Sequence, residues 1–335
     1  MTYEIIEHIS IFKKGLQPSI KKGENVLIVT NSRFPFPSYC ASAMAAISEL
    51  EATSYVFDTG LADNLAPEFI KQTLKGADLC LMMFSAKPGF GWLQSRAHNE
   101  VLHSGTRTLM IMEPIGTLSR LLPDEIVINR TIAHAKRLDR AKIIRVFDKR
   151  GTDLVFSKEG RKTSSEYSVS DKPGRFDHWP ASYPCVAPIE NSAEGVLILH
   201  PGDVVLGLRK RVETEIRLTI HEGMITKFEG GYDAILLKQY FDVYKNNGAK
   251  TTSHFNWGTD HRANWNVIGQ DTECLLGTVD LAFGNNILSS PDDWCGLDGL
   301  NDCVGHCDTG MLGKSMYLDD ELIIDEGVIV PDELK

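Results

Sequence analysis

Short runs of consecutive apolar residues alternate with amphipathic segments in the first half of the chain. The run 25–30 (NVLIVT) is apolar and β-branched on successive positions, as in a strand buried on both faces of a parallel sheet. The same pattern predicts further strands at 53–57, 77–84 and 108–112, and helices between them at 38–50, 67–74 and 95–104. Strands that alternate with helices indicate a doubly wound, mostly parallel α/β domain.

The second half has a different pattern, in which apolar runs meet short polar turns. Such runs predict β-hairpins at three places: 154–156 before the turn 158–160, 216–220 before the turn 221–223, and 316–318 and 322–324 around the turn 319–321. One helix is expected at 234–244, with Gly248 as its stop. The second half is therefore expected to be a β-rich α+β domain that binds metal.

Two domains are expected, because 335 residues exceed the length of a typical single domain. We place an α/β Rossmann-like domain at 1–170 and the β-rich catalytic domain at 171–335, with the active site in the cleft between them. The proline-bearing segment 171–188 forms the seam. No G-x-G-x-x-G sequence follows the first strand, so a dinucleotide site is not expected.

Composition narrows the choice of partners. The net charge of -10 disfavours nucleic acid and anionic membranes, and no apolar run is long enough to span a bilayer. The N-terminal sequence MTYEIIEHISIFKKG has no apolar signal region, so a cytoplasmic protein is expected. Seven cysteines at scattered spacings indicate reduced thiols and no disulfide framework.

His306 and Asp308 stand two positions apart in the glycine-rich segment 299–313. On an extended chain, side chains two positions apart project from the same face, so both can reach one ion. An isolated His-x-Asp pair is weak evidence, because a surface histidine beside a solvated aspartate has the same spacing. The setting among glycines favours the interpretation as metal ligands.

The third ligand is His254 or His261. His254 follows the strand-like segment 250–253, whereas His261 lies beyond a turn at Gly258 and is expected outside the ligand set or exposed. Two imidazoles and one carboxylate with open positions are typical of Fe(II) oxygenases. Zinc uses similar ligands, so the ligand types alone leave the metal open.

Three cysteines and two further histidines have structural interpretations, and one of these histidines, His178, also has a catalytic one. Cys295, Cys303 and Cys307 contain no C-x-x-C spacing, and Cys307 points away from the face of its neighbours if the segment is extended. His178, in the sequence DHWP, suits proton abstraction or packs on Trp179, with the two hypotheses equally weighted. His103 ends a helix, where a cation is favourable.

Three segments together carry a resemblance to known proteins: 254–259 (HFNWGT), 276–286 (LGTVDLAFGNN) and 306–308 (HCD). They resemble the C-terminal pattern of the aminopeptidase T metallopeptidases and, more closely, the 2,5-dihydroxypyridine 5,6-dioxygenase family. Where the peptidases carry a glutamate ligand this chain has His254, and where they carry a histidine ligand it has Asp280. A two-metal peptidase needs several bridging carboxylates, so these departures favour a single metal.

The resemblance implies an Fe(II)-dependent, extradiol-like dioxygenase that opens 2,5-dihydroxypyridine, or a near analogue, to N-formylmaleamic acid with O₂. It implies that His254, His306 and Asp308 bind the iron, that His178 is the catalytic base, and that His103 lines the substrate pocket. A homo-oligomer is also implied. Two alternatives stay open: an aminopeptidase-type hydrolase that uses zinc or cobalt, and a binding protein that a metal stabilises.

Overall fold

The computed structural model describes residues 2–31, 35–59, 68–84 and 95–335. The chain forms two compact units, each built from several segments. Unit 1 comprises residues 1–128, 166–181 and 288–296, and unit 2 comprises residues 129–165, 182–287 and 297–335. The expected boundary at residue 170 and the cleft between the domains stay predictions.

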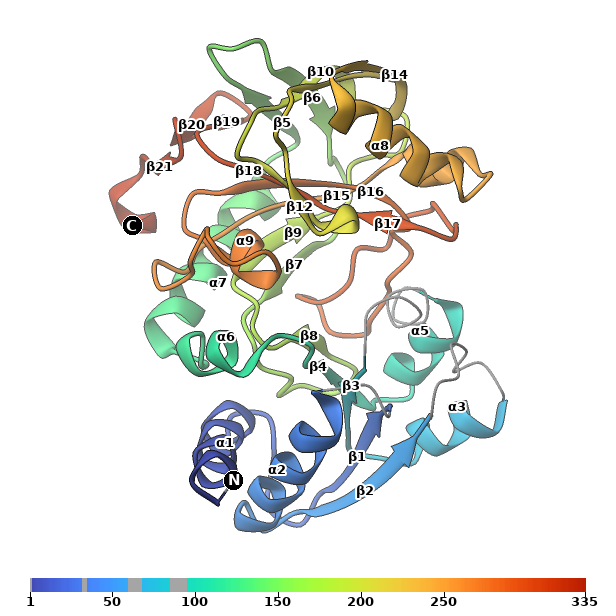
Figure 1. Cartoon of the computed structure of the whole chain (residues 1–335), viewed down its shortest axis with the longest axis vertical. Coiled ribbons are helices and arrows are strands. Elements are labelled where there is room, and N and C mark those ends of the chain that lie inside the picture. Colours follow the sequence, from blue (N-terminus) through green and yellow to red (C-terminus); the bar gives the residue numbers. More distant parts are fainter. Residues whose placement is uncertain (1, 32–34, 60–67, 85–94) are drawn as a thin grey trace. The chain divides into compact units, whose positions relative to one another are not determined.

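Unit 1 contains a five-stranded parallel sheet (Figure 1). In spatial order its strands are β2 (Thr53–Asp58), β1 (Asn25–Thr30), β3 (Leu79–Met83), β4 (Arg107–Met110) and β8 (Phe176–His178). The helices of this unit are α1 (Thr2–Leu16), α2 (Phe36–Glu49), α3 (Glu68–Lys75), α5 (Arg96–His103) and α6 (Ile115–Arg120). The strands predicted from consecutive apolar runs are confirmed, since β1 and β3 are buried on nearly every position.

Three elements of this unit were not predicted from the sequence: the short helix α6, the N-terminal helix α1 and the strand β8. The N-terminal helix α1 packs Phe12 and Leu16 into the core beside Trp179. β8 comes from a segment far along the chain and pairs in parallel with β4, so that Met110 is the register partner of His178. The sheet therefore ends in the strand that carries the predicted base.

Unit 2 contains two antiparallel sheets of eight strands each. The first runs β14 (Met224–Gly230), β13 (Ile216–His221), β10 (Glu194–Leu199), β6 (Asp153–Ser157), β5 (Ile143–Phe147), β19 (Ser315–Leu318), β20 (Glu321–Asp325), β21 (Val328–Ile329). The second runs β12 (Lys210–Arg211), β11 (Val204–Val205), β18 (Thr309–Met311), β16 (Val279–Gly284), β15 (Thr252–Trp257), β9 (Tyr183–Val186), β7 (Thr163–Glu166), and β17 (His306–Cys307) pairs with β16. The predicted mixed α/β class, with a parallel sheet followed by β-rich structure, is confirmed.

Short helices complete unit 2. They are α8 (Tyr232–Asp242), α9 (Gln270–Cys274), and the 3₁₀ helices η1 (Leu206–Leu208), η2 (Asn247–Lys250) and η3 (Asp332–Leu334); α7 (Glu125–Arg140) belongs to both units. The core draws on both sheets, with Phe255 and Leu281 from one and Leu197 and Leu218 from the other. In the described parts of the chain, no helix is long and apolar enough to cross a membrane.

Two of the three predicted hairpins are confirmed. His221 pairs with Met224 across a two-residue turn, and Leu318 pairs with Glu321 in the same way. The hairpin expected at 158–160 is wrong, because β6 pairs with the preceding strand β5 and with the distant β10. The turn is present, but the strand that follows it, β7, belongs to the other sheet of unit 2. The local sequence pattern does not specify which sheet a strand joins.

Candidate metal centre

Three donor atoms of unit 2 converge on one point. His254 Nε2 and His306 Nε2 are 3.1 Å apart, and Asp308 Oδ1 lies 3.0 Å from His306 Nε2 and 3.1 Å from His254 Nε2. The two imidazole rings stack with their centroids 5.0 Å apart. All three side chains are mostly buried. Among the described residues, these three form the group whose spacing fits a metal ion.

Strand alternation puts these side chains on one face of the second sheet. Phe255 and Trp257 of β15 face the core, so His254, between Thr252 and Phe255, faces the other way. The register of β15 against β16 shifts between Thr252 and Phe255, and such a bulge re-aims a side chain. Cys307 enters the core, as expected for the residue between His306 and Asp308. His306 and Cys307 form the strand β17, so the condition set for the opposite orientation of Cys307 is met there.

Neighbouring groups fix the segment that carries His306 and Asp308. The hydroxyl of Tyr240 on α8 donates to the His306 carbonyl at 2.7 Å, and the amide of Leu206 donates to the Asp308 carbonyl at 3.0 Å. His306 Nδ1 lies 3.2 Å from the carbonyl oxygen of Asn285. Because a carbonyl only accepts, Nδ1 carries a hydrogen, and in a neutral ring Nε2 then presents its lone pair.

This donor set fits a cation at its centre. The lone pair of His306 Nε2 faces a carboxylate oxygen and a second imidazole nitrogen, and these contacts repel unless positive charge lies between them. One proton serves one of the three contacts, whereas a metal ion serves all three. Without a metal ion, only protonation of the two imidazoles would relieve this repulsion, and their charges and hydrogen bonds would then hold the pKa of Asp308 well below its ordinary range, although burial alone raises it.

Two further polar side chains occupy the same face of the sheet and were not predicted as part of the site. Asn256 and Asp280 are register partners on β15 and β16 and are fully buried. No hydrogen-bond partner is found among the described residues for the side-chain amide of Asn256, whereas the backbone of Thr309 favours the charged form of Asp280. Burial, and then the charge of Asp308, raises the pKa of Asp280 well above its ordinary value. The group of converging donor atoms comprises His254, His306 and Asp308, and Asp280 is outside it.

The cysteines stay outside this group. Cys307 is buried in the core, and burial raises the pKa of its thiol. Cys295 belongs to unit 1, where its sulfur contacts the backbone of Phe176. Cys185 is the thiol that sequence inspection missed, since its sulfur lies 3.4 Å from His254 Nδ1. Its strand is far from His254 in the sequence, so only the fold reveals this contact.

The other histidine candidates are spread over both units. His261 is exposed, contacts Arg130, and is outside the converging group. His103 is the last residue of α5, is exposed, and lies 3.1 Å from the hydroxyl of Ser289 in unit 1. His178 lies at the carboxyl end of β8. The roles of His178 and His103 stay predictions.

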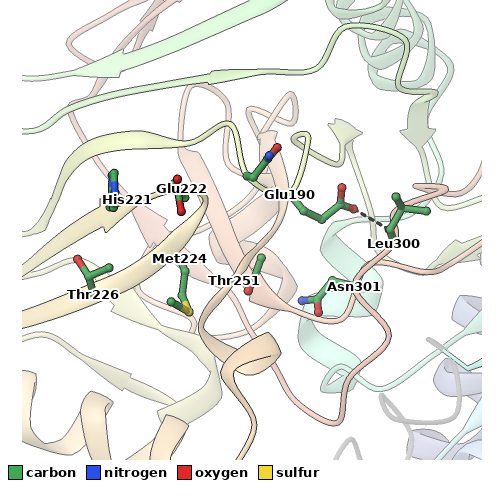
Figure 2. Close-up of a pocket in the computed structure, with 9 residues that line it drawn as sticks. Glu190, His221, Glu222, Met224, Thr226, Thr251, Leu300 and Asn301 are labelled. Atoms are coloured by element: carbon green, nitrogen blue, oxygen red, sulfur yellow. Dashed lines mark hydrogen bonds between the residues drawn. The ribbon is translucent and has the colours of Figure 1, made fainter.

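Unit 2 also has a surface hollow of about 470 Å³, and none of its lining residues belongs to the metal centre (Figure 2). Its lining includes Met224, Thr251 and Asn301, and Glu190 accepts a 2.6 Å hydrogen bond from the amide of Leu300 at its edge. None of the predicted site residues lines it. The candidate site is therefore the buried group of His254, His306 and Asp308 and not this hollow.

Comparison with known proteins identifies the family. The sequence pattern of the 2,5-dihydroxypyridine 5,6-dioxygenases matches residues 7–331, which is nearly the whole chain. The chain belongs to the 2,5-dihydroxypyridine 5,6-dioxygenase family. The resemblance inferred from the segments around His254, Asp280 and His306 is confirmed.

Two comparisons, one with a sequence and one with a solved structure, support the assignment. A 2,5-dihydroxypyridine 5,6-dioxygenase of Pseudomonas putida KT2440 is 32% identical over 290 residues, which cover 84% of this chain and 79% of the relative. A solved structure of the 2,5-dihydroxypyridine dioxygenase from Pseudomonas putida KT2440 matches with a TM-score of 0.86 and 25% identity, over 99% of both chains. The whole fold, and not one segment alone, is that of a dioxygenase of this family.

Proposed function

We propose that this chain is an Fe(II)-dependent, extradiol-like dioxygenase that opens 2,5-dihydroxypyridine between C5 and C6 and yields N-formylmaleamic acid. The observation that carries the proposal is the convergence of His254, His306 and Asp308 in a chain of this family. The product contains the atoms of the substrate plus both atoms of O₂, with the C5–C6 bond broken. The reaction therefore needs no additional reductant.

The three converging residues would hold the iron. Fe(II) bound by two imidazoles and one carboxylate supplies open positions at which an electron-rich substrate and dioxygen react. Asp308 contributes the one negative charge of the ligand set, and the Asn285 carbonyl orients the His306 ring. One carboxylate leaves net positive charge at the centre, which favours a substrate that arrives as an anion.

His178 is proposed as the base that makes the substrate anionic. An imidazole accepts a proton near neutral pH, and the 5-hydroxyl group of the substrate is the acid that it deprotonates. Deprotonation enriches the ring in electrons before it meets oxygen. His103 is proposed to contact the substrate, and the protein is proposed to act as a homo-oligomer, which size-exclusion chromatography with light scattering checks.

The test is ring opening by protein loaded anaerobically with Fe(II), followed by addition of 2,5-dihydroxypyridine and ¹⁸O₂. Mass spectrometry should find N-formylmaleamic acid with two heavy oxygen atoms, and zinc-loaded protein should form none. An aminopeptidase-type hydrolase would instead cleave aminoacyl amides without O₂. A binding protein stabilised by metal would lose thermal stability without metal and turn over neither substrate.

A further inference from the structure

A second pairing of histidine with carboxylate lies in unit 1, away from the three converging donors in sequence. Glu166 Oε2 lies 2.8 Å from His178 Nδ1. Both side chains are nearly buried, with 10% of Glu166 and 12% of His178 exposed. An ionised carboxylate only accepts hydrogen bonds, so Nδ1 carries the shared hydrogen. The neutral ring is thereby fixed as the tautomer whose Nε2 accepts a proton.

A second carboxylate in unit 1, that of Asp177, binds backbone amides next to both members of this pair. Asp177 accepts hydrogen bonds from the amides of Tyr167 at 3.1 Å, Ser168 at 3.3 Å and His178 at 2.8 Å. The two amides that follow Glu166 and the amide of His178 therefore meet on one side chain. The distance between Glu166 and His178 is set by this clamp as well as by their own contact.

Asp177 is itself held in place. Arg175, fully buried, donates to Asp177 at 3.0 Å and to Asp292 at 3.1 Å, and its guanidinium lies 4.0 Å from the centre of the Tyr167 ring. Ser168 has a φ of +68°, a costly conformation for a residue with a side chain. Its hydroxyl donates to the Ala181 carbonyl and accepts from the Ala181 amide. These contacts together fix the backbone on either side of the pair formed by Glu166 and His178.

We propose that Glu166 is a positioning residue that holds His178 in the tautomer and orientation needed to take the hydroxyl proton of the substrate. The inference rests on the proposed function and deepens it. In the step, the substrate O–H bond breaks, its proton forms a bond to His178 Nε2, and the electron pair stays on the substrate oxygen. Nδ1–H stays hydrogen-bonded to Glu166, which stabilises the imidazolium and is not protonated.

Several titratable or charged groups surround this pair. Glu166 and Asp177 contact His178 directly, and Arg175 pairs with Asp177. The ring of Phe176 contacts the rings of His178 and His98, and the backbone of Phe176 contacts the thiol of Cys295. Of these groups, Glu166 is the carboxylate whose side chain meets the imidazole itself. Its charge is therefore the one whose removal changes the imidazole directly.

The test compares Glu166→Gln with wild type over a range of pH. Replacing the charge with a neutral amide should lower kcat by about 10-fold to 100-fold, a part of the ~10²–10⁴ that a general base contributes. The acid limb of the kcat/KM profile should move to lower pH, because the imidazolium loses its stabilising anion. Glu166→Asp should recover part of kcat. A purely structural role would lower stability and leave the position of the acid limb unchanged, which would overturn the proposal.

A surface pair offers a matched control. His221 Nδ1 and Glu194 Oε2 form the same contact at 3.0 Å, but both side chains are largely exposed. Glu194→Gln should leave kcat and the pH profile at wild-type values. If Glu194→Gln moves the acid limb as far as Glu166→Gln does, the effect is one of overall charge and the proposal fails.

Two further measurements separate this inference from the function on which it rests. Imidazole nitrogen NMR of the metal-free protein should show His178 with its proton on Nδ1, and Glu166→Ala should give a mixture of tautomers. Adding Glu166→Gln to His178→Gln should cost no further activity, since Glu166 acts through His178. Full additivity, or an unchanged tautomer, overturns the positioning role. A wild-type protein with no ring-opening activity overturns the proposed function, whatever the NMR result.

Discussion

The two clusters of histidine and carboxylate differ in which atoms meet. In unit 2, one carboxylate oxygen of Asp308 meets the Nε2 atoms of two imidazoles that are themselves 3.1 Å apart. In unit 1, Glu166 meets Nδ1 of a single imidazole, His178. One proton satisfies the second arrangement completely. In the first, three donor atoms contact one another, and one proton can bridge only one of the three contacts. The lone pairs that remain favour a cation at the centre.

The difference teaches that residue types alone do not assign roles to histidines. All three imidazoles lie next to a carboxylate, but only those of His254 and His306 share one. Removing residues of the first cluster should therefore remove metal, whereas changes in the second should impair catalysis with metal in place.

Asp308→Asn should have the largest effect. The amide lacks the charge that offsets the metal, so iron content should fall from about one per chain to under about 0.1, and ring opening by more than about 1000-fold, beyond the ~10–100-fold typical of residues that only support ligands. Elemental analysis and turnover measure both quantities. Asp320→Asn, in an exposed turn, is the control and should leave both unchanged.

His178→Gln should separate the clusters. Loss of the base should lower kcat by about 100-fold or more, within the range for a general base, while iron content stays at the wild-type level. The comparison would break if this variant also lost its iron, because His178 would then belong with the ligands.

Gly284→Ala should disturb the metal centre through the backbone. Gly284 is the register partner of His306 and has a φ of +113°, and an added Cβ would lie 2.2 Å from the Gly305 carbonyl. The strand that carries His306 has to shift, so iron affinity should fall by about 10-fold to 100-fold, as when the support of a ligand is lost. Gly116→Ala, with open space at its Cβ, serves as the control. Equal iron affinities in the two variants would show that β17 does not position His306.

His134→Gln should have the smallest effect on activity, but it should change how the stability of the protein depends on pH. Its Nδ1 accepts from Trp257 and its Nε2 donates to the Leu334 carbonyl, and burial lowers its pKa to about 4. Protonation therefore favours the unfolded chain, where a histidine has its ordinary pKa near 6.5. Stability should be complete above about pH 6.5 and fall by about 3 kcal/mol as the pH drops to about 4. Urea unfolding of wild type and His134→Gln should show that the variant lacks this part of the slope.

The sequence was informative where structure is local. Consecutive apolar runs predicted β1 to β4, and the polar turns at 221–223 and 319–321 predicted the two hairpins in which His221 pairs with Met224 and Leu318 with Glu321. The spacing of His306 and Asp308 predicted that both face one ion, and the ordered segments around them predicted the family. These features depend on residues a few positions apart.

The rest depends on contacts between distant segments. β8 joins the parallel sheet from residue 176 onward, and Cys185 contacts His254 from the adjacent strand β9. Glu166 and His178 are 12 residues apart, and the side chain of Asp177 binds backbone amides next to both of them. No periodicity encodes such meetings, so neither Glu166 nor Cys185 could be assigned from the pattern of residues.

The most direct test of the account measures metal and oxygen on one sample. Protein loaded with Fe(II) and freed of excess metal should contain one iron per chain and consume one O₂ for each 2,5-dihydroxypyridine, with Asp308→Asn failing in both measurements. Two metals per chain, or loss of substrate without uptake of O₂, would contradict a single metal centre formed by His254, His306 and Asp308.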